Sequence, residues 1–354
     1  MVDNIRIRFE RDTFRGTLEN CTFVKENKKE RRFYILSLNK KGNTKLWVFQ
    51  SLINGDIRFE GSLRKWYYGD NSLVDFNRES FVKALKNLAK ILDMSLSDLG
   101  MGTISYLEIG LNVRTRISCD DLLSKIVSYK NFYREGDYQK RGTLYFGLNI
   151  ARQKKAIRTL LIYNKYEEII GRGANSVSAT KMKRNYEILK KHGYYFSRVE
   201  FQIRGRKAIK AMHLENMYNL NSLVEKWSNL YVAWTFHVAK ILVQSQINDS
   251  LPMTRKERSI VESLKKESVG SLIEKVRSTC TSKTAEGMNA KLYREKKCIN
   301  DVILKFGTYA DYNTYTFKAD VALSLIRHCK KESHIAVGAL IRNLWKPTYT
   351  LLIL

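Results

Sequence analysis

The sequence predicts an α+β fold: an antiparallel-rich sheet built from two related β-α-β halves with flanking helices, followed by a mainly helical C-terminal region. Three observations predict it. The first ~65 residues are short runs rich in β-branched and aromatic residues, separated by polar turns. An order of strand, amphipathic helix and strand then occurs twice. Beyond residue 206 apolar residues recur at helical spacing. We therefore expect an α+β domain at 1–205 and a helical region at 206–354.

The N-terminal part is expected to contain consecutive strands. These are 3–9, 15–24, 31–38 and 45–53. A polar turn at 39–43 separates the last two. Asn54-Gly55-Asp56 is a strong turn signal, so 45–53 and 56–63 are predicted to pair as a hairpin.

Helices and strands alternate through the rest of the first domain. Phe81, Leu85 and Leu88 recur at helical spacing, with lysines on the other side, which predicts an amphipathic helix. Asn77 is its expected N-cap. The remaining elements are expected as strands at 104–114, 142–149, 155–163 and 195–204 and as helices at 120–129 and 180–191.

Capping signals and apolar stripes predict the C-terminal helices. Ser222 followed by Glu225 has the pattern of a capping box, and an apolar stripe that includes Trp227 continues to residue 241. Thr254 followed by Glu257 predicts a second helix start. Further helices are expected at 284–305 and 316–331.

Two stretches of the first domain resemble each other. The first runs through 57–69, 77–93 and 106–113, and the second through 158–169, 180–191 and 198–204. Each half has a lysine with aromatic neighbours at the end of its first strand, Lys65 and Lys165, and a glutamate inside its last strand, Glu108 and Glu200. A duplicated unit would bring the two glutamates together from neighbouring strands. The alternative is that this order arose by chance.

Glu108 and Glu200 are the candidate metal ligands. Each lies inside an apolar strand, in L-E-I-G and V-E-F-Q, where an ionised carboxylate is costly unless it is paired or bound to a cation. A divalent cation would also relieve the repulsion between two such carboxylates. Oxygen ligands favour Mg²⁺ or Mn²⁺ over zinc. The alternative is a structural pairing with nearby arginines, namely Arg114, Arg116, Arg198 and Arg204.

Tyr163 is the candidate nucleophile. It ends a strand in LLIYNKYEE, beside Lys165, where a cation could stabilise the charge on an attacked phosphate. Tyr166 is its nearest competitor. No Gly-x-x-x-x-Gly-Lys-Ser/Thr sequence occurs, which argues against ATP hydrolysis.

The charge balance points to a polyanionic partner. The chain has 354 residues, with 63 Lys and Arg against 35 Asp and Glu, a net charge of +28. Its 44% hydrophobic content is that of a globular protein rather than a disordered basic tail. Basic and aromatic residues are interleaved at 64–68 and 130–134, which suits phosphates and unpaired bases. We therefore expect DNA as the partner, ahead of RNA or an anionic membrane surface.

Other classes are excluded by what the sequence lacks. It has no run of ~18 uncharged apolar residues, which excludes a transmembrane helix, and no apolar N-terminal stretch of the signal-peptide type. Its five cysteines are scattered, and none forms a CxxC pair. A cytoplasmic protein with reduced thiols is expected.

Four blocks carry a resemblance to a known family. They are FEGSLRKWYYGDN (59–71), YLEIGLNV (106–113), TLYFG…IRTLLIYNKYEE (143–168) and RVEFQIR (198–204). In order and approximate spacing they resemble phage and plasmid replication initiators of the gene II/X group and, more distantly, the Rep_trans family of plasmid initiators. The resemblance covers about residues 50–240.

The resemblance implies a rolling-circle initiator, which nicks one strand of an origin through a tyrosine and stays attached to the 5′ phosphate. Tyr163 and Lys165 match the family's I-Y-D-K block, and Glu108 and Glu200 match its cation-holding acidic residues. Asn164 stands where relatives often carry Asp, which puts a third acidic ligand in doubt. The residues expected to bind DNA are Arg64, Lys65, Trp66, Tyr67, Arg158, Arg198 and Arg204.

The sequence leaves two matters open. The chain could instead be a non-catalytic DNA-binding protein that marks an origin or represses a promoter. The helical region could read duplex DNA or form a homodimer, and the apolar segment 348–354 could dock on the core or on a second subunit. A host helicase and polymerase are conceivable partners of an initiator.

Overall fold

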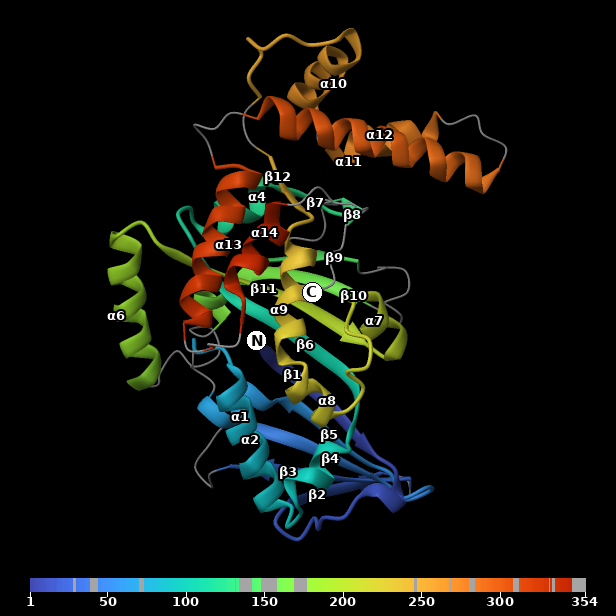
Figure 1. Ribbon diagram of the computed structural model, residues 1–354, viewed down its shortest axis with the longest axis vertical. Coiled ribbons are helices and arrows are strands. Elements are labelled where there is room, and N and C mark those ends of the chain that lie inside the picture. Colours follow the sequence, from blue (N-terminus) through green and yellow to red (C-terminus); the bar gives the residue numbers. More distant parts are fainter. Residues whose placement is uncertain are drawn as a thin grey trace.

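In the computed structural model the predicted α+β class is confirmed, with a mainly helical C-terminal region (Figure 1). The structure describes residues 1–27, 30–38, 44–69, 73–130, 132–133, 142–147, 158–168, 177–244, 247–267, 269–279, 284–307, 312–330, 332 and 335–345. The expected turn at 39–43 and the apolar segment 348–354 lie outside them. Within these residues, no helix combines the length and the apolar character needed to cross a membrane.

Strands of the described residues form two antiparallel sheets. The large sheet consists of β1 (Val2–Phe9), β2 (Thr22–Asn27), β3 (Arg31–Ser37), β4 (Lys45–Ser51), β5 (Ile57–Ser62), β6 (Thr103–Thr115), β9 (Thr143–Phe146), β10 (Arg158–Asn164) and β11 (Tyr195–Arg204). Their order is β2-β3-β4-β5-β1-β6-β11-β10-β9, so β6 and β11 are central. The small sheet consists of β7 (Ile126–Tyr129), β8 (Phe132–Tyr133) and β12 (Ile241–Val243).

The helices precede, separate and follow these strands. In the first part of the chain they are α1 (Leu63–Tyr68), α2 (Arg78–Ile91), α3 (Leu96–Gly100), α4 (Cys119–Lys125) and α6 (Val177–Lys191), with a short 3-10 helix at Arg11–Thr13. The later helices are α7 (Arg206–Ala211), α8 (Leu220–Glu225), α9 (Trp227–Val238), α10 (Arg255–Lys266), α11 (Val269–Ser278), α12 (Ala285–Phe306), α13 (Thr314–Cys329) and α14 (Val337–Trp345).

One face of the large sheet forms the main hydrophobic core. Ile109 and Leu111 of β6 and Val199 and Phe201 of β11 are fully buried there. Trp234 of α9 lies against this face and donates a hydrogen bond from its indole to the Val199 carbonyl oxygen (3.1 Å). Figure 1 shows α9, α13 and α14 overlying the central strands. The alternating residues point to the opposite face, which we call the polar face.

The C-terminal region contributes to two hydrophobic cores. Residues of α9, α13 and α14 belong to the core of the large sheet. Residues of α10, α11 and α12 form a second core, which includes Val261, Ile273 and Ile303. Figure 1 shows these three helices, in orange, standing away from the large sheet.

Several predicted local elements are confirmed and others are corrected. The β4–β5 hairpin, the Asn77 cap and the Thr254–Glu257 capping box are present. The strand expected at 15–24 begins only at Thr22, because the preceding segment is bound to the end of α2 by a hydrogen bond from Thr17 N to Leu92 O (2.7 Å). Of the expected strands, residues 148–149 and 155–157 lie outside the described part.

The helix expected at 120–129 and the long helix expected from 222 are also corrected. Helix α4 ends at Lys125 because 126–129 pair with β12. The long helix expected from residue 222 instead has Asn219 as its N-cap, and it is divided at Lys226 into α8 and α9. β-branched and aromatic side chains that suit a helical stripe also suit a strand, and tertiary pairing decides between them.

The two proposed halves differ in how their strands pair. In the second half, β10 pairs directly with β11. In the first half, β1 lies between β5 and β6 and pairs with both. The two final strands, β6 and β11, pair with each other at the centre of the sheet. The N-terminal strand thus completes the first half and supplies its own side chains to the polar face.

Candidate active site

The register of the central strands brings the two glutamates together. Glu108 lies opposite Gln202, and Glu200 lies opposite Gly110. Directly opposed residues of an antiparallel pair point to one face, as do residues two apart on a strand. Glu108 and Glu200 are therefore diagonal neighbours on the polar face.

Gly110 makes this close approach of the strands possible. A Cβ atom at this position would lie 3.0 Å from Val199 O and 3.1 Å from both Cα and Cβ of Glu200. Any larger residue would push the two strands apart at the point where Glu200 projects. The glycine in L-E-I-G is thus explained by the site beside it.

A pocket of about 840 Å³ lies beside the two carboxylates on the polar face. Tyr163 reaches it from β10, where it lies opposite Arg198 and so shares the face of Glu200. Residues that line this pocket include Asp3, Lys65, Glu108, Tyr163, Glu168 and Glu200. The predicted nucleophile and both predicted metal ligands therefore meet at one pocket.

Glu108 is surrounded by neutral hydrogen-bond donors. Its carboxylate accepts hydrogen bonds from the Asn4 amide, the Tyr106 hydroxyl and the Gln202 amide, the last at 3.0 Å. Among the described residues, no lysine or arginine forms an ion pair with it, although it is only 5% exposed. Burial and the neighbouring Glu200 raise the pKa of Glu108. A cation at this point would relieve both costs.

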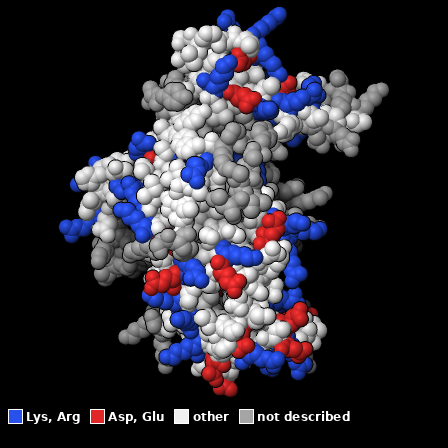
Figure 2. Space-filling model, in the orientation of Figure 1, with Lys and Arg blue, Asp and Glu red and all other residues white. Residues whose placement is uncertain are grey.

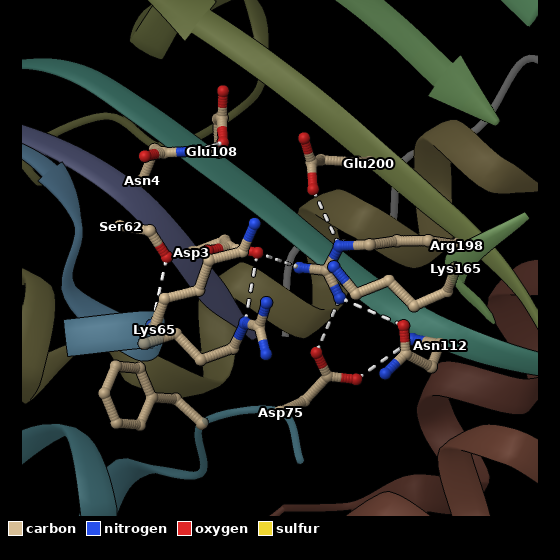
Figure 3. Close-up of polar contacts among 12 residues, drawn as sticks. Asp3, Asn4, Ser62, Lys65, Asp75, Glu108, Asn112, Lys165, Arg198 and Glu200 are labelled. Carbon is tan, nitrogen blue, oxygen red and sulfur yellow. Dashed lines mark hydrogen bonds and ion pairs between the residues drawn. The ribbon is translucent and has the colours of Figure 1, made fainter. Parts of the chain in front are cut away.

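Glu200 is instead part of a buried ionic cluster around Arg198 (Figure 3). The guanidinium of Arg198 is fully buried and lies 2.7 Å from Glu200, 2.7 Å from Asp75 and 3.1 Å from Asp3. The Asn112 side chain accepts a further hydrogen bond from it (3.2 Å). The alternative prediction of a glutamate–arginine pairing is therefore realised for Glu200 and not for Glu108.

The two equivalent lysines meet at Glu168. Lys65, which follows β5, lies 2.9 Å from one carboxylate oxygen of Glu168, and Lys165, which follows β10, binds the other. Burial lowers the pKa of Lys165 to about 8. Burial would by itself raise the pKa of Glu168, but the two lysines outweigh this and hold it at about 2. Positive charge is thus held firmly at one side of the pocket.

The structure separates the two candidate nucleophiles. Tyr163 lines the pocket, with the Lys165 ammonium 5.6 Å from the centre of its ring. Tyr166 does not line it, and its ring stacks on Tyr186 of α6 at a centroid distance of 3.6 Å. Burial and the nearby Glu200 raise the pKa of Tyr163 well above its ordinary value. Its phenol is therefore protonated unless a positive charge is brought close to it.

Asn164, the departure from the family pattern, serves as a local cap. Its side-chain oxygen accepts hydrogen bonds from the backbone N–H groups of Tyr166 (3.1 Å) and Glu167 (3.3 Å). This interaction begins the short helical turn at 165–168 that orients Lys165 and Glu168.

Three of the residues expected to bind DNA are buried, which corrects those assignments. Arg64 is fully buried and paired with Asp3 (3.0 Å), Arg198 is the centre of the ionic cluster, and Trp66 is 3% exposed. Arg64 and Arg198 instead compensate buried carboxylates. In this conformation none of the three can contact a phosphate or a base.

The other expected DNA contacts differ in their surroundings. Tyr67 packs in an aromatic cluster with Tyr68 and Phe76. Arg204 is exposed, with its guanidinium 5.6 Å from the centre of the Tyr106 ring. The side chain of Arg158 lies outside the described part of the structure, as do Asn131 and Arg134 of the second basic stretch.

Sequence reasoning missed the acidic residues that surround Arg198. Asp3 is 3% exposed near the start of β1. The apolar-strand signal that identified Glu108 is weak there, because β1 also carries Asn4, Arg6 and Arg8. Asp75 lies in the loop before α2 and carried no such signal. Only the fold brings Asp3, Asp75 and Arg198 together from distant parts of the chain.

The residues present fit a divalent cation of the magnesium type. Among the described residues, no group of three or more His, Cys, Asp or Glu is arranged to hold a metal ion. Mg²⁺, however, is commonly held by one or two carboxylates together with substrate phosphates and waters. Glu108 and Glu200 meet that smaller requirement. The amides of Asn4 and Gln202 can add oxygen atoms if they rotate.

The positive charge of the chain is distributed over many elements. Figure 2 shows Lys and Arg side chains spread across the visible face instead of gathered in one patch. Such a distribution attracts a polyanion to the molecule as a whole. The binding site for such a polyanion must therefore be located from the arrangement of individual side chains.

The chain matches a known protein family over more than half of its length. A family model for the N-terminal region of a phage replication-associated protein of the gene II type matches residues 43–228, more than half of the chain. The matched region begins before β4, ends within α9 and contains Glu108, Tyr163 and Glu200. No curated protein sequence matches the chain.

Proposed function

Because the chain belongs to this family of phage replication-associated proteins of the gene II type, we propose that it is a rolling-circle initiator that nicks and rejoins DNA through Tyr163. The family match supports a role in phage replication, and an initiator is expected to bind DNA. The nicking chemistry and its dependence on Mg²⁺ or Mn²⁺ are our proposal.

One observation carries the proposal. Tyr163, Glu200 and Glu108 lie on the same face of three neighbouring strands and line one pocket. A hydroxyl nucleophile next to a pair of buried carboxylates is the arrangement that metal-assisted phosphoryl transfer requires.

Each residue then has a defined part. Glu108 and Glu200 would hold the cation, which supplies positive charge that stabilises the attacked phosphate. The same charge would oppose the effect of Glu200 on Tyr163 and favour its phenolate. Lys65, which lines the pocket and is fixed by Glu168, can approach a phosphate oxygen.

The reaction balances without an external energy source. The Tyr163 oxygen forms a bond to phosphorus, the bond from phosphorus to the 3′ oxygen breaks, and that oxygen takes up a proton. The phenolic proton is lost to solvent. One phosphodiester replaces another, so the reverse attack by the 3′ hydroxyl can rejoin the strand without ATP.

The test uses single-stranded oligonucleotides from the replicon that encodes the chain, labelled at either end. With Mg²⁺ or Mn²⁺, a 3′ label should become covalently attached to the protein and a 5′ label should not. Tyr163→Phe should abolish the attachment, and Tyr166→Phe is the matched control that should retain it. Attachment that survives in Tyr163→Phe excludes Tyr163 as the nucleophile.

A second candidate is a non-catalytic DNA-binding protein. It is favoured by the ion pair between Glu200 and Arg198, which already compensates one of the two carboxylates. Calorimetric titration with Mn²⁺ distinguishes the two. The enzyme should bind Mn²⁺ in a saturable manner that Glu108→Gln removes, whereas the exposed Glu79→Gln leaves it intact. A protein without saturable binding would fit the second candidate.

A further inference from the structure

A tract of arginine and aromatic side chains crosses the polar face of the large sheet beyond the pocket. We define this aromatic–arginine tract by its members, which are Arg6, Phe33, Trp47, Phe49, Arg58, Tyr106 and Arg204. Strand pairing joins them laterally: Arg204 lies opposite Tyr106, and Tyr106 lies opposite Arg6. On the next strands Arg58 lies opposite Phe49, which lies opposite Phe33.

The alternation of side chains along these strands places the tract on the polar face of the sheet, opposite the hydrophobic core. Ile5 and Ile7, which flank Arg6, are buried in the core, as are Phe59 beside Arg58 and Val48 beside Phe49. The hydrophobic effect therefore fixes which face each side chain takes. The aromatic residues of the tract lie on the face away from the core, where burial does not explain them.

The tract side chains place flat groups next to one another, with Phe33 edge-on to Phe49. The Arg58 guanidinium lies 4.3 Å from the centre of the Phe49 ring, and Phe33 meets Phe49 at a centroid distance of 5.3 Å. Trp47 is 41% exposed and lies 6.5 Å from Phe49. Aromatic rings and guanidinium planes at such spacing are the groups on which unpaired bases stack.

A row of hollows that share lining residues extends from the Tyr163 pocket to the tract. Next to that pocket is a hollow of about 270 Å³, and the two share Asn4 and Glu108. A third hollow, of about 360 Å³, shares Arg6 with the second and is lined by Phe49 and Arg58. The path crosses six adjacent strands, β10 to β4, and the five spacings between them, at ~4.8 Å each, amount to about 24 Å.

The charge along the path is positive. Arg6, Arg8, Arg31, Arg58 and Arg204 line it, against the acidic residues Asp56, Glu60 and Glu108. Arg6 is paired with Glu60 and Arg8 with Asp56, whereas among the described residues no carboxylate pairs with Arg31 or Arg204, and both of these side chains are exposed. Donors remain for phosphate oxygens.

We propose that the aromatic–arginine tract binds the single-stranded DNA that enters the Tyr163 pocket, with bases on the aromatic groups and phosphates on the arginines. The proposal rests on the proposed function for the identity of the strand, and extends it to residues outside the pocket. Single-stranded DNA is favoured over duplex because rings can stack only on unpaired bases.

Binding and fluorescence test the proposal in the full-length Tyr163→Phe protein with EDTA, where no cleavage occurs. The probe is a fluorescein-labelled oligo(dT), compared with a duplex of equal length. Phe49→Ala and Arg58→Ala should each weaken oligo(dT) binding on the order of tenfold. Arg58→Ala should also reduce the dependence of affinity on salt by about one phosphate contact. Lys86→Ala, at an exposed position of α2 on the other side of the sheet, is the matched charge control.

Tryptophan fluorescence gives a readout that does not depend on a destabilising substitution. Unlabelled oligo(dT) should quench the fluorescence of Trp47, so that Trp47→Phe loses the quenching and keeps the affinity. Trp345 is 44% exposed on α14, and Trp345→Phe should keep the quenching. Three results would overturn the proposal: unchanged affinity in Phe49→Ala and Arg58→Ala, quenching that persists in Trp47→Phe, or equal affinity for duplex.

The outcome is separable from that of the nicking proposal. If Tyr163→Phe still attaches to DNA, the nucleophile is wrong, while the tract measurements stand. If the tract variants bind oligo(dT) like the parent protein while Tyr163-dependent attachment persists, the tract is wrong and the nicking proposal stands.

Discussion

The two halves of the large sheet place equivalent glutamates in different surroundings. Glu200, in the second half, is paired with the buried Arg198. Glu108, in the first half, is held by Asn4, Tyr106 and Gln202, none of which is charged. Similar sequence blocks have thus given one carboxylate with an ion-pair partner and one that has none among the described residues. The carboxylate without an ion pair is where an added cation gains most.

The largest expected effect is on covalent attachment to DNA, when either of the two glutamates is replaced. Glu108→Gln and Glu200→Gln should each reduce covalent attachment to DNA on the order of 100-fold, since each removes a ligand of the proposed cation. Attachment rates with Mg²⁺ and Mn²⁺ measure this effect. Retained attachment in Glu108→Gln would show that the first half does not contribute to the site.

The cluster around Arg198 should dominate stability. Arg198→Met would leave Asp75 and Glu200 buried without this cation, and Asp3 with Arg64 alone, and should cost about 3–5 kcal/mol of unfolding free energy. Urea denaturation followed by circular dichroism measures this cost. Arg204→Met, on an exposed neighbour of the same strand, is the control. Equal stability of the two variants would contradict a structural role for the cluster.

The two glutamates should also differ in their effect on stability. Glu200→Gln weakens the cluster and should cost about 2 kcal/mol. Burial and the neighbouring Glu200 raise the pKa of the Glu108 carboxyl, so its charge is unfavourable in the folded state. Glu108→Gln removes this charge and should therefore be neutral or stabilising in metal-free protein. Urea denaturation in EDTA compares the two variants. Equal destabilisation would mean that the two halves are electrostatically alike.

Glu168, which binds the lysines of both halves, should make the free energy of unfolding depend on pH in the acidic range. Its folded pKa of about 2 lies below the model-peptide value of 4.5, so its contribution is present above pH 4.5 and is lost as pH falls through 2. The contribution amounts to about 3 kcal/mol. The difference in stability between the wild type and Glu168→Gln should shrink across this window. A constant difference would contradict the assignment.

The smallest effect is expected at Lys65. Its side chain is 13% exposed, whereas that of Lys165 is 1% exposed, and Glu168 keeps Lys165 when Lys65 is replaced. Lys65→Met should therefore cost no more than about 1 kcal/mol. Urea denaturation measures it. A larger loss would show that the first half holds Glu168 as firmly as the second does.

The sequence predicted the parts of the site that repeat a local pattern. Glu108 and Glu200 were identified because a charged residue inside an apolar strand needs a partner, and strand periodicity gave their face. The helix starts at Asn77 and Thr254 followed from capping residues. The Tyr163 block was identified by its resemblance to the family's I-Y-D-K block, which is also a short continuous segment.

The sequence could not predict which basic residues are available to DNA. Nothing in the sequence around Arg64 and Arg204 distinguishes them, yet Arg64 is fully buried beside Asp3 and Arg204 is exposed. That difference depends on contacts between residues far apart in the chain. Likewise, the aromatic–arginine tract comes from several separate strands, and no single segment shows its pattern.

The sequence by itself therefore determined the fold class and the two glutamate-bearing strands, because these depend on local periodicity and on the high cost of burying a charge. The tertiary structure alone decided that β1 enters the centre of the sheet, that Arg198 compensates Glu200 and not Glu108, and that a positive path leads away from Tyr163. These features arise from pairing between distant strands, which fixes the neighbours of every charge and which local sequence does not encode.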